Sequence, residues 1–573
     1  MLATDPRNLA HNLANRLNLV FPIAGLPDEL LAEVFSWYIL AVCSAVQRYP
    51  HYTTQPVIDL YSPEPAEFIA PPLTPYSWII IRHVCRAWRM VALTYPALST
   101  RIFMTRPECV RDLLSRAGNL PLYIYLPSYT FQLLYRDDMV ASCNLVLPHL
   151  GRISHASLLF PEESAYPGLQ ASQSGVSEAR SLDLRFQEAW SVVSPFPSDC
   201  AFPELHSLSC HTANITALRN VFVPHLRTLE LVNCSSAPVN TLLALLRTMP
   251  GLEELVLDKV ISGLEHWTQI HDICLSPQAP DRVALPHLRR ISISAWSASE
   301  GLPILDRIEH PPSTAIDLHF HWLLIRNEHA GCDCVLRLLL AKIDAWRCLE
   351  DPAAQSLHVI ANREQANFSI MLTLWRERLP LSSLPTSVGD DSAFFRFSLS
   401  GYHETFIANV VRRLPLSNVK TALLKDEGFL WDVVKWEDML ASLSSVEELA
   451  LFYEAIEHEG AQLHEVIPRD THAFCPRLKV VRIRESQLDH SYGVLRKPSP
   501  DRVTLAHLAR GFAERNYLRV DGGYETPPFQ LEVQGYSPRA RRPQSSVQQP
   551  SGLKSWLAAR GAQISATLKR RRR

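Results

Sequence analysis

Apolar residues near the start of the chain recur in steps of three and four, which predicts a helix with one apolar face. Pro27 stands where a first helical turn tolerates proline, and Asp28 and Glu29 follow where the helix dipole favours negative charge. We therefore expect the helix to begin at this proline. Its apolar face consists of Leu30, Leu31, Val34, Phe35 and Tyr38, and Leu26 just before the helix extends that face.

A second helical period runs over residues 78–93. The stretch between the two helices, residues 47–77, contains seven prolines and no helical period, so we interpret it as an extended insertion. For either helix alone, the plainer interpretation is a core helix of a small bundle. The apolar positions of the second helix are Ile81, Val84, Cys85, Trp88 and Ala92.

A helix over residues 109–118 and a short strand over 122–126 lead into the body of the chain, where one eight-residue frame recurs. The frame is proline, any residue, apolar, any two residues, apolar, any residue, apolar. The starts from Pro203 to Pro286 are 21, 26 and 36 residues apart, so the period is loose. Clear copies begin at Pro203, Pro224, Pro250, Pro286 and Pro476, Ser444 replaces proline in another, and weaker copies begin near Pro148, Ser177, Pro311, Pro352 and Ser417.

The alternation that ends each frame predicts a short strand with one buried face. Residues 239–247 have a helical period and would return the chain to the next strand. A strand and a helix, repeated, form a leucine-rich-repeat-like α/β solenoid, in which stacking buries a face that no unit can bury alone. The alternative is an ordinary α/β domain, which the number of copies and the lack of a glycine-rich first turn disfavour. Residues 320–440 fit the frame worst.

The length of 573 residues favours several domains or one elongated array, and a content of 47% apolar and 20% charged residues is that of a folded protein. Twelve cysteines are scattered, without a secretory segment, and we expect mostly buried thiols in a reducing compartment. The longest run of low polarity, residues 34–46, is too short to span a bilayer. We expect an intracellular protein without a transmembrane segment, in the cytoplasm, the nucleus or both.

The formal net charge of −2 conceals a basic tail. From Tyr536 onward the chain has ten Lys or Arg and no acid, so we expect a separate and disordered segment at 536–573. Its last residues, Lys569 to Arg573, resemble a short nuclear-import signal; a solvated run of charge is the alternative. Contact with anionic membrane or RNA through this tail is a third interpretation, and elsewhere we expect no nucleic-acid partner.

Candidate catalytic chemistry is sparse. Cys332 and Cys334, near His329 and Cys348, form the most metal-like group, but no second pair stands at zinc spacing. The acid pair at 390–391 is more typical of a solvated loop. The chain has no phosphate loop, nucleophile elbow, His-Glu-x-x-His or dinucleotide fingerprint. We expect no catalytic residue, metal, cofactor or small-molecule substrate, and histidines such as His225 and His287 occupy variable positions of the frame.

Taken together, the two N-terminal helices carry ordered motifs. Leu26-Pro27-Asp28-Glu29-Leu30-Leu31-Ala32-Glu33-Val34-Phe35, then Val84-Cys85-Arg86-Ala87-Trp88-Arg89, then Tyr95-Pro96-Ala97-Leu98, resemble an F-box. More narrowly, the stretch is similar to the F-box-like proteins that are abundant in mushroom-forming fungi. The resemblance covers residues 24 to 103, and the sequence departs from a compact F-box in its proline-rich insertion.

This resemblance implies docking onto the Skp-type linker subunit of a cullin-based ubiquitin ligase. The implied contacts come from the opening Leu-Pro and the apolar face of the first helix, and the Cys-x-x-Trp helix completes the module. The residues that match the motif, and are thus the expected partner-binding residues, are Leu26, Pro27, Leu30, Leu31, Val34, Phe35, Val84, Cys85 and Trp88.

The expected organisation is an N-terminal arm (1–23), an F-box-like helical module (24–105), a leucine-rich-repeat-like solenoid (106–535) and the basic tail. The function expected from it is that of a non-catalytic adaptor, which holds the linker subunit and, through it, a cullin at one end and an unknown target protein at the other. The alternative is a repeat scaffold without ligase association, in which the apolar face of the first helix is buried within the chain. An enzyme would need distant acids, His or Cys to converge.

Overall fold

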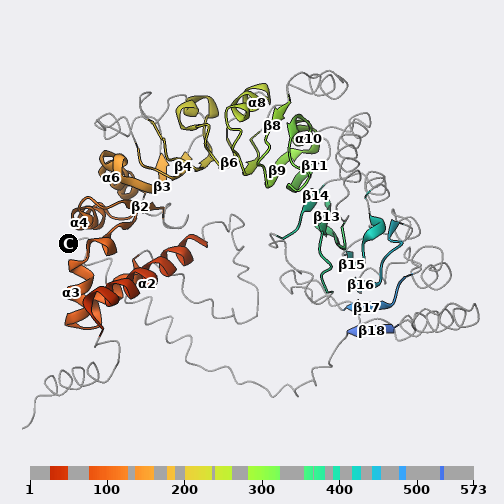
Figure 1. Cartoon of the computed structure of the whole chain (residues 1–573), viewed down its shortest axis with the longest axis horizontal. Coiled ribbons are helices and arrows are strands. Elements are labelled where there is room, and N and C mark those ends of the chain that lie inside the picture. The colour runs from red at the N-terminus through yellow and green to blue at the C-terminus, as the bar shows by residue number, and fades with distance from the viewer. Residues whose placement is uncertain are drawn as a thin grey trace, which may run out of the picture.

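The chain folds around one large sheet, in which sixteen strands lie side by side. Helices and mostly parallel strands together make this an α/β protein, as the sequence predicts. In Figure 1 the sheet of this computed structural model curves as an arc. Among the residues that the structure describes, no helix is long and apolar enough to cross a membrane. The described residues are 26–48, 76–126, 136–160, 177–186, 201–234, 239–260, 282–322, 354–364, 367–380, 392–400, 414, 416–426, 442–452, 477–484 and 530–534.

Four helical segments and a short strand form the N-terminal end of the arc. The first helix begins at Asp28, one residue after the predicted start at Pro27, and its first turn holds Asp28 and Glu29. The segments are α2 (Asp28–Arg48), the 3-10 helix η2 (Ser77–His83), α3 (Arg86–Thr94), the 3-10 helix η3 (Pro96–Ser99) and β1 (Arg101–Phe103).

The prediction of a single helix over residues 78–93 is wrong, because the chain forms two helices there, η2 and α3. Cys85 has extended backbone angles (φ −155°, ψ 174°) and is the N-cap of α3. Its sulfur accepts the Trp88 N–H at 3.5 Å, and this bond satisfies an amide that has no partner inside the helix. The motif Val-Cys-x-x-Trp thus encodes a helix start, which apolar periodicity alone does not distinguish from a helix interior.

Tyr76 ties the helical end to the sheet. Its hydroxyl donates to the Phe103 carbonyl at 2.5 Å and accepts the Phe103 N–H at 3.0 Å. The two rings meet edge to face with centroids 5.6 Å apart, and Trp78 beside them is fully buried. The helices therefore pack directly onto the first strand.

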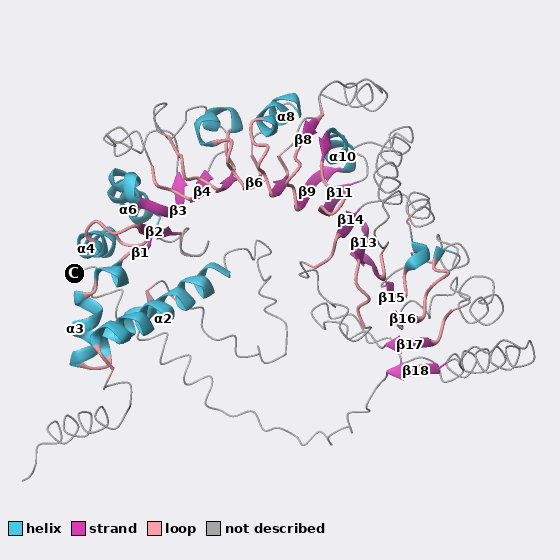
Figure 2. Ribbon diagram, viewed as in Figure 1, coloured by secondary structure: helices cyan, strands magenta, loops and turns pink. Residues whose placement is uncertain are grey.

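The first nine strands of the sheet all run parallel and in sequence order, whereas β8 and β10 pair with each other outside it. Figure 2 shows the helices that follow β1 on the outer side of the arc and the strands of the sixteen-stranded sheet on its inner side. The strands are β1, β2 (Leu122–Tyr125), β3 (Ile153–Phe160), β4 (Ser181–Phe186), β5 (Ser207–His211), β6 (Thr228–Val232), β7 (Glu254–Asp258), β9 (Arg290–Ser297) and β11 (Ala315–Trp322); β8 (Val283–Ala284) pairs with β10 (Ile308–Glu309).

The proline frame has a physical cause in the turn before each strand. The Leu226 N–H donates to the Val223 carbonyl at 3.1 Å, which puts Pro224 at the second position of a turn, where its fixed φ suits the backbone. The next two amides, of residues 227 and 228, both donate to the His206 carbonyl of the preceding repeat. The same pattern recurs at residues 252, 253 and 254, so the frame sets both the turn and the strand pairing.

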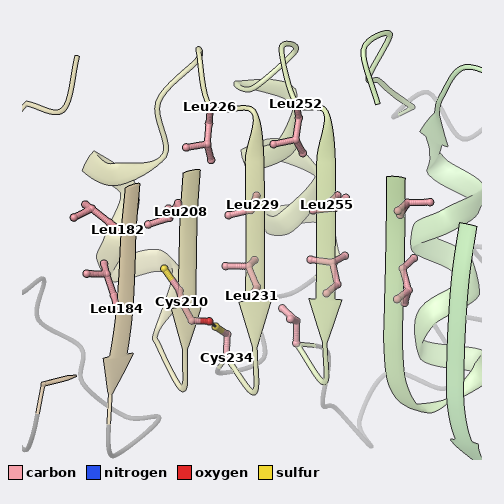
Figure 3. Close-up of a cluster of buried hydrophobic side chains, with 14 of the residues drawn as sticks. Leu182, Leu184, Leu208, Cys210, Leu226, Leu229, Leu231, Cys234, Leu252 and Leu255 are labelled. Atoms are coloured by element: carbon pink, nitrogen blue, oxygen red, sulfur yellow. Dashed lines mark hydrogen bonds between the residues drawn. The ribbon is translucent and has the colours of Figure 1, made fainter. Parts of the chain in front are cut away.

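The apolar positions of the frame form the core. In Figure 3 the leucines of neighbouring strands lie in rows across the sheet, and Cys234 donates its thiol to the Cys210 carbonyl at 3.3 Å. Burial raises the pKa of Cys234 to about 11, so the thiol stays protonated at neutral pH. The fully buried members of these rows include Leu208, Leu226, Leu229, Leu231, Leu252 and Leu255.

Helices cover the outer side of these rows. The helix predicted at residues 239–247 is present with the same bounds, and Leu242, Leu243 and Leu246 face the core. The helix predicted before β2 is also present. The outer segments are α4 (Pro107–Ala117), α6 (Arg136–Val146), η4 (Leu147–Arg152), η5 (Ile215–Val221), α8 (Val239–Arg247) and α10 (Ala298–Arg307).

A reversal interrupts the sheet where the frame fits worst. Next to β11 lies β14, then β13, then β12, so three strands appear in reverse order. β13 runs antiparallel to both of its neighbours, whereas β12 and β14 run parallel to the rest. The strands are β12 (Ser356–Glu364), β13 (Asn367–Trp375), β14 (Phe395–Ser400), β15 (Thr421–Asp426, after η7 at Leu416–Asn418), β16 (Glu448–Phe452), β17 (Val480–Arg484) and β18 (Gln530–Gln534).

Candidate functional site

The helix α2 has two apolar stripes rather than the single apolar face expected from its sequence. Leu31, Phe35 and Ile39, spaced four residues apart, are buried in the chain's own core. The Phe35 ring meets the Trp88 ring edge to face, with centroids 4.9 Å apart. This inner stripe packs α2 against α3. Its side chains are buried within the chain and are therefore not free to contact a partner.

The second stripe of α2 faces outward, and we call it the outer stripe. Leu30 is 49% exposed, Val34 42%, Trp37 66% and Tyr38 41%. These residues are spaced by four, three and one, so they lie along one side of the helix. Monomeric proteins seldom expose neighbouring large apolar side chains, and such a surface indicates an interaction site.

The elements packed against α2 add further exposed apolar side chains. Ile80 on η2 is 62% exposed, Val84 just after it 52%, and Met90 on α3 53%. Between them, the Arg82 guanidinium lies over the Trp78 ring at 5.3 Å, and burial lowers its pKa. Exposed apolar side chains therefore occur both on α2 and on the segments that carry the second half of the motif.

The structure divides the nine expected partner-binding residues between two environments. The exposed ones are Pro27, Leu30, Val34 and Val84, whereas Leu31 and Phe35 are buried. The half-buried ones are Leu26, Cys85 and Trp88.

Four exposed apolar residues are not among the nine expected partner-binding residues: Trp37, Tyr38, Ile80 and Met90. Trp37 could have been found, because it lies seven residues after Leu30 and continues the same side of the helix. Ile80 could not, since only the burial of Trp78 and Ile81 shows which side of η2 faces the solvent.

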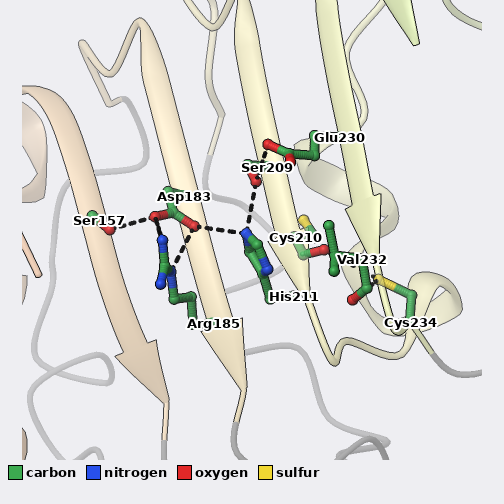
Figure 4. Close-up of polar contacts among 9 residues, drawn as sticks. All are labelled: Ser157, Asp183, Arg185, Ser209, Cys210, His211, Glu230, Val232 and Cys234. Carbon is green, nitrogen blue, oxygen red and sulfur yellow. Dashed lines mark hydrogen bonds and ion pairs between the residues drawn. The ribbon is translucent and has the colours of Figure 1, made fainter. Parts of the chain in front are cut away.

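The inner face of the sheet presents the alternate, polar residues of the strands. In Figure 4 the Asp183 carboxylate accepts hydrogen bonds from Ser157 at 2.5 Å and from Arg185 at 3.0 Å. Ser209 on the next strand donates to Glu230 at 2.9 Å. Each carboxylate of this cluster thus accepts a hydrogen bond from a serine of the neighbouring strand.

The same cluster contains a serine, a histidine and an aspartate, but not in the geometry of a catalytic triad. The Nε2 atom of His211 lies 3.1 Å from Ser209 Oγ and 3.6 Å from Asp183 Oδ1. A triad needs the serine at one ring nitrogen and the aspartate at the other, so that the acid orients the base. Here both groups approach the same nitrogen, and Ser209 donates to a carboxylate instead.

A second cluster lies at the carboxyl ends of β7, β9 and β11. The Lys259 ammonium is 4.6 Å from the centre of the Trp296 ring. The His321 ring is 5.2 Å from that tryptophan, and the His319 ring is 4.9 Å from His321. Burial lowers the pKa of both histidines, so both imidazoles are neutral at pH 7.

Within the described ranges, no three or more His, Cys, Asp or Glu side chains are grouped so that they could hold a metal ion. The metal-like group around Cys332 and Cys334 and the acid pair at 390–391 lie outside those ranges, as do the N-terminal arm, residues 49–75 of the insertion and the basic tail. His225 and His287 are exposed, as expected for variable positions of the frame.

No family model and no curated protein sequence matches this chain. The F-box resemblance therefore stays a prediction from the motif residues. The two candidate functional surfaces are the exposed apolar side of the helical end and the polar inner face of the sheet.

Proposed function

We propose that this protein is a non-catalytic substrate-recognition adaptor of an SCF-type ubiquitin ligase. The observation that supports this proposal best is the outer stripe of α2. Leu30, Val34 and Trp37 stay exposed although the helix already has a complete buried stripe for its own packing. A helix that is apolar on two sides needs a second partner, and the F-box resemblance names one, the Skp-type linker subunit.

Docking would follow the physics of a helix in an apolar groove. Each large apolar side chain that becomes fully buried can contribute about 1.5 to 3 kcal/mol, before the cost of association. Leu30, Val34, Trp37 and Tyr38 supply such side chains from one helix, and Ile80 and Val84 supply more from the second motif. These six residues form the proposed linker surface.

The long sheet would hold the target protein. In this proposal the strand-and-helix units form a leucine-rich-repeat-like solenoid whose inner face presents variable side chains. The linker subunit would connect the chain to a cullin, and the ligase would bring the ubiquitin-charged enzyme close to a target lysine. The rate then increases through effective concentration, without an acid or base from this chain. Such a function belongs to the cytoplasm or the nucleus.

A repeat scaffold without ligase association is the second candidate, and one observation favours it. Leu31, Phe35 and Ile39 are buried within the chain, next to the first strand and its helices. A helical cap that shields the end of a repeat array requires this kind of burial. The two candidates differ in what the outer stripe contacts.

Co-expression with a Skp-type linker subunit separates the two candidates. The double variant Leu30→Asp, Val34→Asp places charge on the outer stripe and leaves the inner stripe intact, so the fold should be kept. Leu120→Asp is the matched control, because Leu120 is an exposed leucine (39%) outside the helical motif. We expect the wild type and the control to co-purify the linker and the double variant to lose it.

Two results would count against the adaptor. If the double variant retains the linker as well as the wild type does, the outer stripe is not the docking surface. If the wild type itself fails to retain the linker, the scaffold is the better description. Trp88 is unsuitable for this test, since it packs on Phe35 and its loss would disturb the fold.

A further inference from the structure

The cluster at the carboxyl ends of β7, β9 and β11 combines an exposed aromatic ring with hydrogen-bond donors. Trp296 is 46% exposed, although it lies on a strand of the sheet. The carboxyl ends of parallel strands meet at one edge of a sheet, which is where ligands of α/β proteins commonly bind. Exposed tryptophan is also among the residues that contribute most to binding energy at interfaces.

Lys259 is fixed in place by its backbone. It follows the last residue of β7, has a positive φ of 52° and donates its N–H to the Ser294 carbonyl at 2.7 Å. Its ammonium lies over the Trp296 ring, and within the described part of the chain no carboxylate forms an ion pair with it. The ammonium is therefore available to an anionic partner.

Among the charged side chains described beside the cluster, the arginines have carboxylate partners, whereas Lys259 has no ion pair. Asp317 is shared by Arg396 at 3.3 Å and Arg290 at 3.9 Å. Asp258, one residue before Lys259, is the other acid close to the histidines. Glu254 is the register neighbour of Arg290, so Lys259 and the two arginines lie near three carboxylates. The attraction for an anionic ligand therefore comes from the Lys259 ammonium itself and not from a net positive charge.

The remaining side chains provide donors and space. A neutral imidazole has one N–H donor, and the cluster has two such rings, His319 and His321. In the strand register the neighbours of His319 are Ser294 on one side and Ser398 on the other. Both are small, so His319 has no large neighbour on the adjacent strands, whereas the His321 ring lies beside Trp296.

We propose that Lys259, Trp296, His319 and His321 form a binding site for an acidic segment of a target protein, in which a carboxylate stands beside an apolar side chain. The carboxylate accepts hydrogen bonds from the Lys259 ammonium and an imidazole N–H, and the apolar side chain lies on Trp296. This inference deepens the proposed function, since it specifies the target that the inner face of the sheet receives.

Selection from a random peptide display library on the purified full-length chain tests the site without assuming a sequence. We expect the selected peptides to be enriched in Asp or Glu next to an aromatic or aliphatic residue. A synthetic peptide from that pool should bind Lys259→Glu about tenfold or more weakly than the wild type, because a charge-assisted hydrogen bond is lost. Trp296→Ala should weaken it by a similar factor.

Two control variants test whether a loss of peptide binding is specific to this site. Arg111→Glu makes the same charge reversal on an exposed residue of α4, on the outer side of the sheet, and should bind like the wild type. The linker-docking variant Leu30→Asp, Val34→Asp should also bind the peptide normally. Selection without acidic enrichment, or equal binding by the Lys259 and Arg111 variants, would overturn the proposed site and leave the linker proposal standing.

Discussion

Gly301 illustrates how closely α10 approaches the sheet. A Cβ atom at this position would lie 2.6 Å from the Phe320 ring and 3.0 Å from Ile293. Both neighbours are fully buried, so they have little room to move. Since extra carbon in a tight core costs about 1 to 3 kcal/mol, we expect Gly301→Ala to lower the free energy of unfolding by that amount.

Gly251 is the matched control for this substitution, because a Cβ there would meet its nearest atoms at 3.8 and 3.9 Å. Gly251→Ala should leave the midpoint of urea unfolding nearly unchanged. Equal destabilisation by the two variants would show that the Gly301 effect does not come from contact with Phe320.

His155 gives the stability of the sheet a pH dependence of known sign. Burial and the nearby Arg101 lower its pKa below the ordinary value of 6.5, against an opposing effect of Asp183. The unfolded chain takes up the proton near pH 6.5 and the folded chain only at lower pH. The histidine's contribution to stability is therefore complete above pH 6.5 and is lost as the pH falls below it.

The free energy of unfolding of the wild type should fall between about pH 7.5 and about pH 5.5, and that of His155→Gln should fall less. Urea titration at each pH measures both. The group titrates in the wild type only, so the two curves should converge as the pH falls. A variant whose stability falls as steeply as that of the wild type would show that His155 does not contribute to this dependence.

The sequence does not predict which of two neighbouring apolar residues is buried. The pattern over residues 28–40 predicted the helix and its apolar content. It could not separate Leu30 from Leu31, because adjacent apolar residues lie about 100° apart on a helix and only tertiary packing decides which is buried. For the same reason the clustering of Lys259 with His321 could not be predicted, since it needs the register of strands far apart in sequence.

At the scale of elements, the proline frame predicted strand positions well. Strands follow every one of its clear and weak copies, because the frame combines a turn with the alternation of a half-buried strand. The frame failed to predict β13 and β14, which belong to the reversed part of the sheet. β13 is antiparallel to its neighbours and follows β12 directly, so it needs no proline turn, whereas β14 runs parallel to β11 and still has no copy of the frame.

Within one frame, the leucine and its neighbour should differ sharply. Leu226 is fully buried, whereas His225 is exposed. We expect Leu226→Ala to lower the free energy of unfolding by about 2 to 5 kcal/mol, because it leaves a cavity. His225→Ala should stay within about 0.5 kcal/mol of the wild type. Similar losses in urea unfolding at both positions would contradict the role assigned to the frame.

At the scale of the whole molecule, the sequence predicted an α/β protein with its strands in a long series, and the sixteen-stranded sheet agrees with that prediction. Composition and periodicity could not predict the reversal at β12 to β14, which depends on a connection that skips two strand positions. Nor could they show that α2 is apolar on two sides, one buried and one exposed. The adaptor proposal depends on this last feature.

Equilibrium binding of the purified chain to a purified Skp-type linker subunit, measured by titration calorimetry, tests the adaptor proposal most directly. If the outer stripe of α2 docks the linker, Val34→Asp should weaken binding by about tenfold to a hundredfold, which corresponds to the loss of one buried apolar side chain. Leu120→Asp should bind with the affinity of the wild type. Wild-type affinity in the Val34 variant would contradict the account.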